Sequence, residues 1–462
     1  MMLWEYIRER MLRYPTQKVK ENDAYMTYEE LVVYAEKFAK KLSREKHCAI
    51  FCSSEMATAM ALLACFAAGV TAVPLSIRYG KAHVDKILKV LNPSCMITDQ
   101  GGELGVIYFD RYDNYKIDGH PALIMWTSGT TGVPKGAMLS EKNILTNIQD
   151  ISVYFKIDAS DTILIARPLY HSGVLTGEFL TALNCGTQII FCSKPFDPNL
   201  LIRILRDNFV TVFCGTPTLM QLMLKFVQRN EGIHVKHISV SGECMSKETG
   251  LAISKTFCGA NIYYVYGLTE ACPRVSYMPP EHFQEAPDCV GVPLKSVQVE
   301  IRDDSNMKVR QGERGVLWVK GESVMLGYYN APDLTAEKLK DGWLCTGDLA
   351  VINENGWLKI LGRSDDLIIR AGVNIYPQEI EAELIKDPRT VEVLAYGYDD
   401  LKMGVQIALK IVGSFKNTDE VRKMCIDRLP SYQIPSRIEL VEDIPKNGSG
   451  KFVRPKQKGR CT

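Results

Sequence analysis

Short apolar segments alternate with helical segments up to about Val292, and this alternation restricts the possible fold more than any other feature of the chain. An amphipathic helix is predicted over Tyr28–Leu42 and another helical segment over Leu200–Asp207. Strands that alternate with helices in this way are typical of α/β layers with largely parallel sheets. The apolar segments with the length of buried strands are Cys48–Cys52, Gln188–Cys192, Val210–Cys214 and His237–Ser241.

An uncharged stretch over Met56–Leu75 is about as long as a membrane span. It is rich in alanine, however, and Gly69 and Pro74 interrupt its end. The sequence therefore favours a buried helix over Met56–Ala68, which turns at Gly69 into a short strand over Val70–Val73. No membrane span is expected.

The pattern changes after Val292, where apolar and polar residues alternate and turn signals follow. A small β-rich subdomain is predicted there. A charged segment follows Gly362, and a helix is predicted over Pro377–Ile385. We therefore predict a large N-terminal domain over residues 1–362 and a mobile α+β C-terminal domain over residues 363–462. The alternating segments of the subdomain are Val297–Arg302, Gly315–Lys320 and Trp357–Leu361.

Composition excludes few functions. Hydrophobic residues make up 46% and charged residues 24% of the 462, which suits a globular protein with ample core. The formal net charge of +1 gives no indication of a nucleic acid partner. The 14 cysteines form no Cys-x-x-Cys pair, so neither a zinc site nor a disulfide framework is predicted. Reduced thiols and an N-terminus charged too early for a signal peptide predict a cytoplasmic protein. A monomer or homodimer is expected.

The segment Thr127-Ser-Gly-Thr-Thr-Gly-Val-Pro-Lys-Gly136 follows an apolar run, Ala122–Trp126, that is predicted to be a buried strand. Its glycines let backbone N–H groups approach an anion, while hydroxyl groups and a lysine add donors and positive charge. A P-loop is excluded, because Lys135 precedes Gly136 instead of following the second glycine. A flexible surface loop is the alternative to a polyphosphate site. The candidate nucleotide-binding residues are Thr127, Ser128, Gly129, Thr130, Thr131, Gly132 and Lys135.

A second motif, Tyr263-Tyr-Val-Tyr-Gly-Leu-Thr-Glu270, begins as an aromatic strand and ends in polar residues. Ligands of α/β sheets bind at the carboxyl ends of strands, which is where this motif ends. The Tyr266 ring can stack on a base, Thr269 can bind a phosphate and Glu270 can hold Mg²⁺. Taken alone, the motif would favour a core strand followed by helix-capping residues.

Three further motifs place charged residues in mobile or turning segments. Trp343-Leu-Cys-Thr-Gly-Asp348 puts Asp348 after a tight turn, where it can accept both ribose hydroxyls, although an ordinary turn aspartate is the alternative. In Gly362–Pro377, Arg363 can bind a ribose or phosphate, whereas the adjacent Asp365 and Asp366 are consistent with a solvated linker. Pro445-Lys-Asn-Gly-Ser-Gly-Lys451 can be a basic, fraying tail.

Together the five motifs resemble, in order, those of the adenylate-forming superfamily, which includes acyl-CoA synthetases, firefly luciferases and adenylation domains of nonribosomal peptide synthetases. The resemblance covers essentially the whole chain. It implies that Tyr266, Gly267, Asp348 and Arg363 bind the nucleotide and that Lys451 is the catalytic lysine of adenylation. It also implies that Asp365 is the hinge about which the C-terminal domain rotates.

The segment Pro168-Leu-Tyr-His-Ser-Gly173 is similar to a pattern of acyl- and aryl-CoA synthetases, in which His171 would lie between the acyl pocket and the reaction centre. A buried structural histidine is the alternative. Ser241–Cys244 resembles the loop that lines the acyl and adenine pockets, which adds Gly242 and Glu243 to the binding residues. The Pro168–Gly177 region lacks the aspartate with which related domains hold an amino acid's ammonium group.

The resemblance therefore implies ATP-dependent activation of a fatty or aromatic carboxylic acid, not an α-amino acid, to an acyl-adenylate. Thioester formation with coenzyme A follows. Loading of a carrier-protein phosphopantetheine is the alternative. The expected cofactors are ATP, Mg²⁺ and coenzyme A. A kinase or ATPase would need a Walker lysine, and a non-enzymatic nucleotide-binding protein should lack Lys451 or Glu270. The implied catalytic residues are Lys451, His171, Thr269 and Glu270, with Glu270 as the Mg²⁺ ligand.

Overall fold

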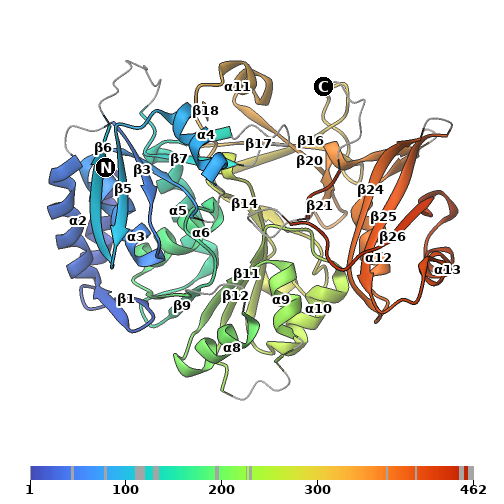
Figure 1. The fold of residues 1–462 in the computed structure, drawn as a ribbon, viewed down its shortest axis with the longest axis horizontal. Helices are drawn as coiled ribbons and strands as arrows, with labels where there is room; N and C mark the ends of the chain where they lie inside the picture. The colour runs from blue at the N-terminus through green and yellow to red at the C-terminus, as the bar shows by residue number, and fades with distance from the viewer. Residues whose placement is uncertain are drawn as a thin grey trace. The chain divides into compact units, whose positions relative to one another are not determined.

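The computed structural model describes residues 2–42, 46–77, 81–109, 120–127, 135–192, 197–224, 226–227, 232–370, 373–400, 403–446 and 452–455. The chain forms two compact units (Figure 1). The first unit contains Met1–Glu300 and Trp318–Thr346, and the second contains Ile301–Leu317 and Gly347–Thr462. Rotation of residues 363–462 as a separate domain stays a prediction.

The larger sheet of the first unit has nine strands in the order β15-β14-β13-β12-β11-β9-β10-β1-β2. The six adjacent strands from β13 to β1 run parallel to one another. The outer strands are antiparallel to their neighbours, with β2 beside β1, β14 beside β13 and β15 beside β14. This arrangement confirms the predicted α/β class. The strands are β1 (Lys18–Glu21), β2 (Ala24–Thr27), β9 (Thr162–Ile165), β10 (Gln188–Phe191), β11 (Val212–Gly215), β12 (His237–Ser241), β13 (Asn261–Gly267), β14 (Arg274–Tyr277) and β15 (Val292–Pro293).

The second sheet of this unit has seven strands in the order β18-β8-β7-β4-β3-β5-β6. The four neighbours β7, β4, β3 and β5 are parallel, as expected for strands joined by helices. The strands are β3 (His47–Phe51), β4 (Thr71–Pro74), β5 (Cys95–Gln100), β6 (Glu103–Tyr108), β7 (Leu123–Thr127), β8 (Lys135–Leu139) and β18 (Gly327–Tyr328).

Helices follow most of these strands, and Figure 1 shows α2 and α3 beside β3 and β5. The helices of the first unit are α1 (Leu3–Leu12), α2 (Tyr28–Leu42), α3 (Glu55–Ala68), α4 (Lys81–Leu91), α5 (Glu141–Phe155), α6 (Ser172–Val174), the π-helix η1 (Leu175–Leu180), α7 (Thr181–Cys185), α8 (Pro198–Asp207), α9 (Pro217–Leu224), α10 (Lys247–Thr256) and α11 (Pro332–Lys338).

The uncharged stretch after residue 55 forms the buried helix α3, which packs on α2 and β4. The Ser54 hydroxyl accepts a hydrogen bond from the backbone N–H of Ala57 and starts the helix, and Gly69 ends it with a φ of 67°. Helix α3 begins one residue before its predicted start. Across the ranges that the structure describes, no helix has both the length and the apolar character needed to cross a membrane.

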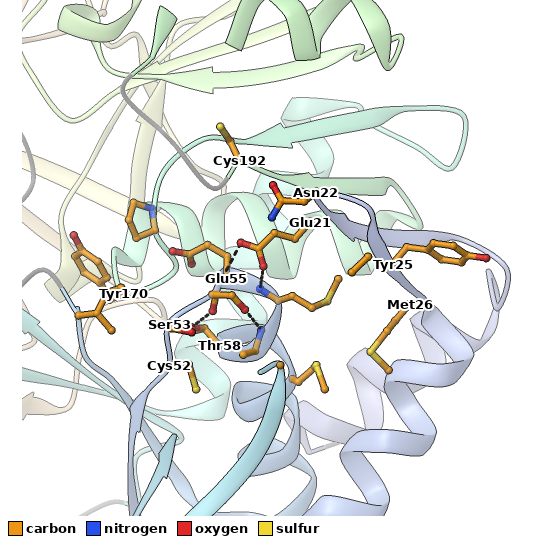
Figure 2. A pocket seen from close by; sticks show the side chains of 18 of the residues that line it. Glu21, Asn22, Tyr25, Met26, Cys52, Ser53, Glu55, Thr58, Tyr170 and Cys192 are labelled. Atoms are coloured by element: carbon orange, nitrogen blue, oxygen red, sulfur yellow. Dashed lines mark hydrogen bonds between the residues drawn. The ribbon is translucent and has the colours of Figure 1, made fainter. Parts of the chain in front are cut away.

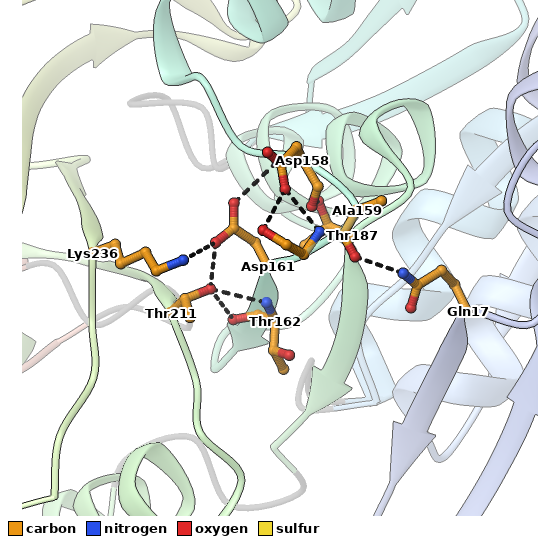
Figure 3. A network of polar contacts seen from close by, with 9 residues as sticks. Gln17, Asp158, Ala159, Asp161, Thr162, Thr187, Thr211 and Lys236 are labelled. Atoms are coloured by element: carbon orange, nitrogen blue, oxygen red, sulfur yellow. Dashed lines mark hydrogen bonds and ion pairs between the residues drawn. The ribbon is translucent and has the colours of Figure 1, made fainter.

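A polar network holds the amino ends of four parallel strands of the nine-stranded sheet (Figure 3). The buried Asp161 carboxylate, just before β9, accepts a hydrogen bond of 2.8 Å from the Thr211 hydroxyl, just before β11. Lys236, just before β12, lies 3.7 Å from the same carboxylate. The Thr187 hydroxyl, just before β10, donates to the carbonyl of Asp158 at 3.0 Å. Contacts between protein side chains therefore hold the amino ends of these strands in place. Ligands of α/β sheets bind at the opposite, carboxyl ends of the strands.

A five-stranded sheet has the order β16-β17-β20-β19, with β21 beside β20. This sheet confirms the β-rich segment that was predicted after Val292. The strand predicted at Trp357–Leu361 begins one residue later, because Trp357 completes the preceding turn. The strands are β16 (Val297–Arg302), β17 (Gly315–Gly321), β19 (Leu339–Lys340), β20 (Trp343–Ile352) and β21 (Leu358–Arg363).

The second unit contains its own apolar core, in which α12 packs on β24 and α13 on β26. Ile380 and Leu384 of α12 are fully buried in the same apolar cluster as Ile407 and Leu409 of β25. Such a core is the requirement for an independently folding unit. Its elements are β22 (Ile368–Arg370), β23 (Val373–Ile375), α12 (Pro377–Leu384), β24 (Thr390–Asp400), β25 (Gly404–Gly413), α13 (Thr418–Arg428) and β26 (Arg437–Leu440).

Candidate active site

The glycine-rich loop connects two antiparallel strands, because Thr127 at the end of β7 pairs with Lys135 at the start of β8. A strand therefore follows the loop, whereas a P-loop leads into a helix. Gly136 is required by packing, since a Cβ there would lie 2.8 Å from Cγ2 of Ile124. The predicted phosphate-binding residues Ser128, Gly129, Thr130, Thr131 and Gly132 lie outside the described residues, and so does the Thr127 side chain.

Tyr328 lies close to both Lys135 and Glu270, two of the predicted site residues. Its hydroxyl donates a hydrogen bond of 2.8 Å to Oε1 of Glu270. Nζ of Lys135 lies 5.9 Å from the centroid of the Tyr328 ring. Sequence reasoning missed Tyr328, because a tyrosine in a short apolar segment has no local mark that separates it from a core residue.

Glu270 fits the role of a Mg²⁺ ligand. Its backbone carbonyl accepts a hydrogen bond of 2.8 Å from the N–H of Met325, so both its backbone and its carboxylate are held in place. A carboxylate oxygen is the hard ligand that Mg²⁺ prefers, and Mg²⁺ is commonly bound by one or two carboxylates together with substrate phosphates. No cluster of three or more His, Cys, Asp or Glu side chains suited to a metal occurs within the described ranges.

The histidine motif and the Thr-Glu motif meet directly. The Ser172 hydroxyl lies 3.0 Å from the Thr269 hydroxyl, although the two residues are far apart in the sequence. His171 precedes α6, is half-buried, and its ring centroid lies 4.2 Å from that of Tyr170. Both motifs follow the carboxyl ends of parallel strands, β9 and β13, as expected for a ligand site in an α/β sheet.

Two of the predicted nucleotide-binding residues in this unit have structural reasons for their identity. A Cβ at Gly267 would lie 2.2 Å from the carbonyl oxygen of Pro273, so only glycine fits there. The Glu243 carboxylate accepts hydrogen bonds of 3.2 Å and 2.6 Å from the backbone N–H and hydroxyl of Thr218 at the start of α9. In this structure the Glu243 carboxylate therefore caps helix α9. Of the other two predicted residues, Gly242 has a φ of 96°, and Tyr266 is half-buried at the end of β13.

Asp348 and Arg363, both in the second unit, are paired with each other. Nη1 of Arg363 lies 3.1 Å from Oδ1 of Asp348, and the strands that carry them are antiparallel neighbours. Gly347 has a φ of 71°, and the Ser364 hydroxyl donates to its carbonyl at 3.0 Å. A carboxylate and a guanidinium are thus held side by side, which is a suitable pair for ribose hydroxyls. Asp365 is exposed, in a 3₁₀ turn over Ser364–Asp366.

Lys451 itself lies outside the described residues, but the chain on both sides of its loop is anchored. Lys446 and Phe452 form an antiparallel bridge, and the N–H of Val453 donates to the carbonyl of Pro445 at 2.9 Å. Arg454 forms ion pairs with Glu381 at 2.6 Å and with Asp366 at 3.2 Å. The segment after Lys451 is therefore not a fraying tail as far as Arg454.

A pocket of about 520 Å³ lies between the β1–β2 hairpin, the start of α3 and the segment just before His171 (Figure 2). Figure 2 shows Tyr170 at one end and Tyr25 at the other. Glu21 accepts hydrogen bonds from the first turn of α3, and Glu55 accepts one of 2.8 Å from the N–H of Leu169. The described residues that line it include no Lys, Arg or His, so the pocket suits an uncharged chain or ring better than a phosphate.

The fold is that of adenylate-forming enzymes. It matches o-succinylbenzoate CoA synthetase from Bacillus subtilis, solved with its acyl-adenylate intermediate, with a TM-score of 0.86 at 26% identity over 97% of this chain and 96% of that chain. It also matches ATP-bound MatB from Rhodopseudomonas palustris, with a TM-score of 0.86 at 24% identity over 98% of this chain and 97% of that chain.

The chain belongs to the AMP-binding enzyme family, whose sequence profile matches residues 7–329. The profile of the AMP-binding enzyme C-terminal domain matches residues 379–451. The expected superfamily is thereby confirmed.

Among curated proteins, the long-chain-fatty-acid–CoA ligase of Haemophilus influenzae is 34% identical over 72% of this chain. The corresponding ligase of Salmonella typhimurium is 33% identical over the same share. The chain spans about 60% of the length of these two ligases. Feruloyl-CoA synthase of Amycolatopsis sp. is 30% identical over 85% of this chain and 84% of its own length.

Proposed function

We propose that this protein is an AMP-forming acid–thiol ligase of the acyl-CoA synthetase type. The observation that carries the proposal is the convergence of separate motifs in the first unit. Ser172 contacts Thr269 at 3.0 Å, and the neighbouring Glu270 accepts a hydrogen bond of 2.8 Å from Tyr328. The Glu270 carboxylate and Lys135 lie near the same tyrosine, and together with the hydroxyl pair they would form a site for a metal-bound polyphosphate.

In the first half-reaction a carboxylate oxygen of the acid attacks the α-phosphorus of ATP, and pyrophosphate leaves. Because the attacking and leaving groups are both anionic, positioning and electrostatic stabilisation account for most of the catalysis. Glu270 would hold Mg²⁺, which when bound neutralises charge on the phosphate oxygens. Lys135 and the loop before it would bind the β- and γ-phosphates, and Lys451 would bridge the carboxylate and the α-phosphate.

The second half-reaction transfers the acyl group to a thiol. The thiolate attacks the acyl carbon of the adenylate, a thioester forms and AMP leaves. We propose coenzyme A as the acceptor, since the curated relatives are named as CoA ligases and synthases. The pocket beside Tyr170, whose described lining includes no Lys, Arg or His, supports a substrate part without phosphate. Replacing coenzyme A with carrier proteins in the thioester assay tests this assignment.

We propose a fatty or aromatic acid as the substrate. The names of the relatives include both a long-chain fatty acid and a ferulic acid derivative. Ser172 occupies part of the region in which amino-acid-activating domains carry an aspartate, and it bonds to Thr269 instead. The test is acid-dependent exchange of pyrophosphate into ATP over a panel of fatty, aromatic and amino acids. Exchange supported by fatty or aromatic acids is expected, and exchange with amino acids alone would contradict the proposal.

A further inference from the structure

Three charged side chains, two of them buried and the third partly buried, lie beside the segments that carry Ser172 and Thr269. Arg167 follows β9, Glu178 lies in the π-helix η1, and Arg274 is the first residue of β14. Arg274 is 3% exposed and Glu178 is fully buried. Arg167 and Glu178 form an ion pair. Charged side chains are rarely buried to this extent without a specific reason.

The guanidinium of Arg274 lies directly against the helix that begins at Ser172. A Cβ at Gly177 would lie 3.1 Å from both Nε and Nη2 of Arg274, so the guanidinium occupies the space above that glycine. The backbone of Arg274 pairs with Gly267, two residues before Thr269. Because Ser172 and Thr269 touch, Arg274 is held between the two segments that form the reaction centre.

The side chain of Asn147 fixes the backbone at this position. Its amide donates to the carbonyl of Arg274 at 2.9 Å and accepts from the N–H of Arg274 at 3.2 Å. The backbone that carries the Arg274 side chain is therefore held in place, and such support helps to orient a binding side chain.

The charges and hydrogen bonds of this group are incomplete. Two guanidinium groups act electrostatically on one carboxylate, so positive charge exceeds negative charge by one among these three side chains. Within the described ranges, Nε of Arg274, Nε of Arg167 and Oε2 of Glu178 have no hydrogen-bond partner. Buried polar atoms are nearly always paired, so an ordered water or a ligand group is expected to complete these hydrogen bonds. Burial raises the pKa of Glu178, whereas Arg167 and Arg274 act to lower it.

We propose that Arg274 binds a second carboxylate of the acid substrate, and that the preferred substrate is a dicarboxylic acid. One carboxylate is activated beside Thr269 and His171, and the other accepts hydrogen bonds from the planar guanidinium fork, whose geometry matches a carboxylate. The inference rests on the proposed function, since it concerns the acid of that same reaction.

The test compares each dicarboxylic acid with its monocarboxylic partner of equal length, for example adipate with hexanoate, in acid-dependent pyrophosphate exchange. The wild-type protein should give a kcat/KM at least tenfold higher for at least one diacid than for its partner. Arg274→Gln should lower that ratio at least tenfold, mainly through KM for the diacid. Arg274→Lys keeps the charge without the fork and should retain part of the preference.

Two further variants separate binding from structure. Gly177→Ala leaves every charge in place but adds a Cβ against the guanidinium, and it should reduce the diacid preference by a smaller factor. Arg203→Gln, on the exposed face of α8, is the control and should leave the ratio unchanged. Thermal melting checks that each variant is folded, and if Arg274→Gln is not, Gly177→Ala and Arg274→Lys decide the outcome.

A wild-type preference for monocarboxylic acids would overturn the inference while leaving the proposed function intact. An equal loss of activity with both members of a pair in Arg274→Gln would also overturn it, because a structural role predicts that result. Absence of exchange with every acid in both series would instead contradict the proposed function, and this inference with it.

Discussion

At the scale of single residues, Tyr328 is the side chain that links the predicted metal ligand to Lys135 of the predicted phosphate loop. Its hydroxyl bonds to Glu270, and its ring lies near Nζ of Lys135. Tyr328→Phe removes the hydrogen bond that orients the carboxylate, so we expect KM for Mg-ATP to rise about three- to tenfold, as for a loss of about 1 kcal/mol. Glu270→Gln removes the charge itself and should lower kcat/KM more than a hundredfold.

The adjacent Tyr329 provides a matched control for this prediction. It is buried, and its hydroxyl donates to the carbonyl of Leu91 at 3.0 Å, away from Glu270. Tyr329→Phe should lower the free energy of unfolding by about 1 kcal/mol without changing KM for Mg-ATP. If Tyr328→Phe and Tyr329→Phe gave the same kinetic constants, Tyr328 would have no role in orienting Glu270.

His47 gives the first unit a dependence on pH. Burial lowers the pKa of this histidine from 6.5 to about 4, and Lys46 adds to the effect. The unfolded chain binds a proton at His47 more readily than the folded chain does. The contribution of neutral His47 to the free energy of unfolding is therefore complete above pH 6.5 and is lost as the pH falls through about 4. We expect the free energy of unfolding to fall by about 2–3 kcal/mol more in the wild type than in His47→Gln over that range.

Denaturant unfolding at several pH values measures this difference. His282→Gln is the control, because His282 is exposed and lies 3.1 Å from Glu285 on the surface. It should follow the wild-type curve. Parallel curves for the wild type and His47→Gln between pH 7 and pH 4 would show that His47 is not responsible.

At the scale of elements, Arg454 ties the segment after Lys451 to α12 and to the turn that contains the predicted hinge. Its partners Glu381 and Asp366 are mostly buried, so removal of the guanidinium leaves two poorly solvated carboxylates. Arg454→Met should therefore destabilise the second unit by about 2–3 kcal/mol. It should also slow adenylation at least tenfold, because the lysine segment loses its anchor.

A thermal melt gives the first result and single-turnover adenylate formation the second. Arg437→Met, at an exposed position of β26 paired with Glu439, is the matched control and should change neither by much. Unchanged stability in Arg454→Met would show that the ion pairs of Arg454 do not stabilise the second unit.

Sequence patterns predicted the elements well where the pattern is local. The helix Tyr28–Leu42 and the strand His237–Ser241 have the predicted bounds, because apolar periodicity reports burial directly. The strand expected at Val210–Cys214 begins at Val212 instead, since Thr211 joins the polar network before it. Strand ends depend on such contacts with other strands, which periodicity does not contain.

The candidate site was predicted from its motifs, but the residues that support the motifs were not. Tyr328 lies 58 residues from Glu270, and Arg454 lies 73 residues from Glu381. Contacts over such separations are created by the order of strands in the sheets, and no local pattern indicates them. The Asp348–Arg363 pair is an intermediate case, because both residues were predicted but their contact was not.

At the scale of the whole molecule, the chain consists of two compact units that carry different parts of the proposed chemistry. The first unit carries the phosphate loop, His171 and Glu270, and the second carries the Asp348–Arg363 pair, Asp365 and the lysine segment. We propose that residues 363–462, which begin at the predicted hinge, serve the two half-reactions in turn. The adenylating lysine would act in the first and withdraw for the second.

The half-reactions of Lys451→Ala test this account most directly. The measurement is acyl-adenylate formation from ATP and acid, beside thioester formation from a synthetic acyl-adenylate and coenzyme A. The account predicts that adenylate formation falls at least a thousandfold while thioester formation stays within a few-fold of the wild type. An equal loss in both half-reactions would contradict it.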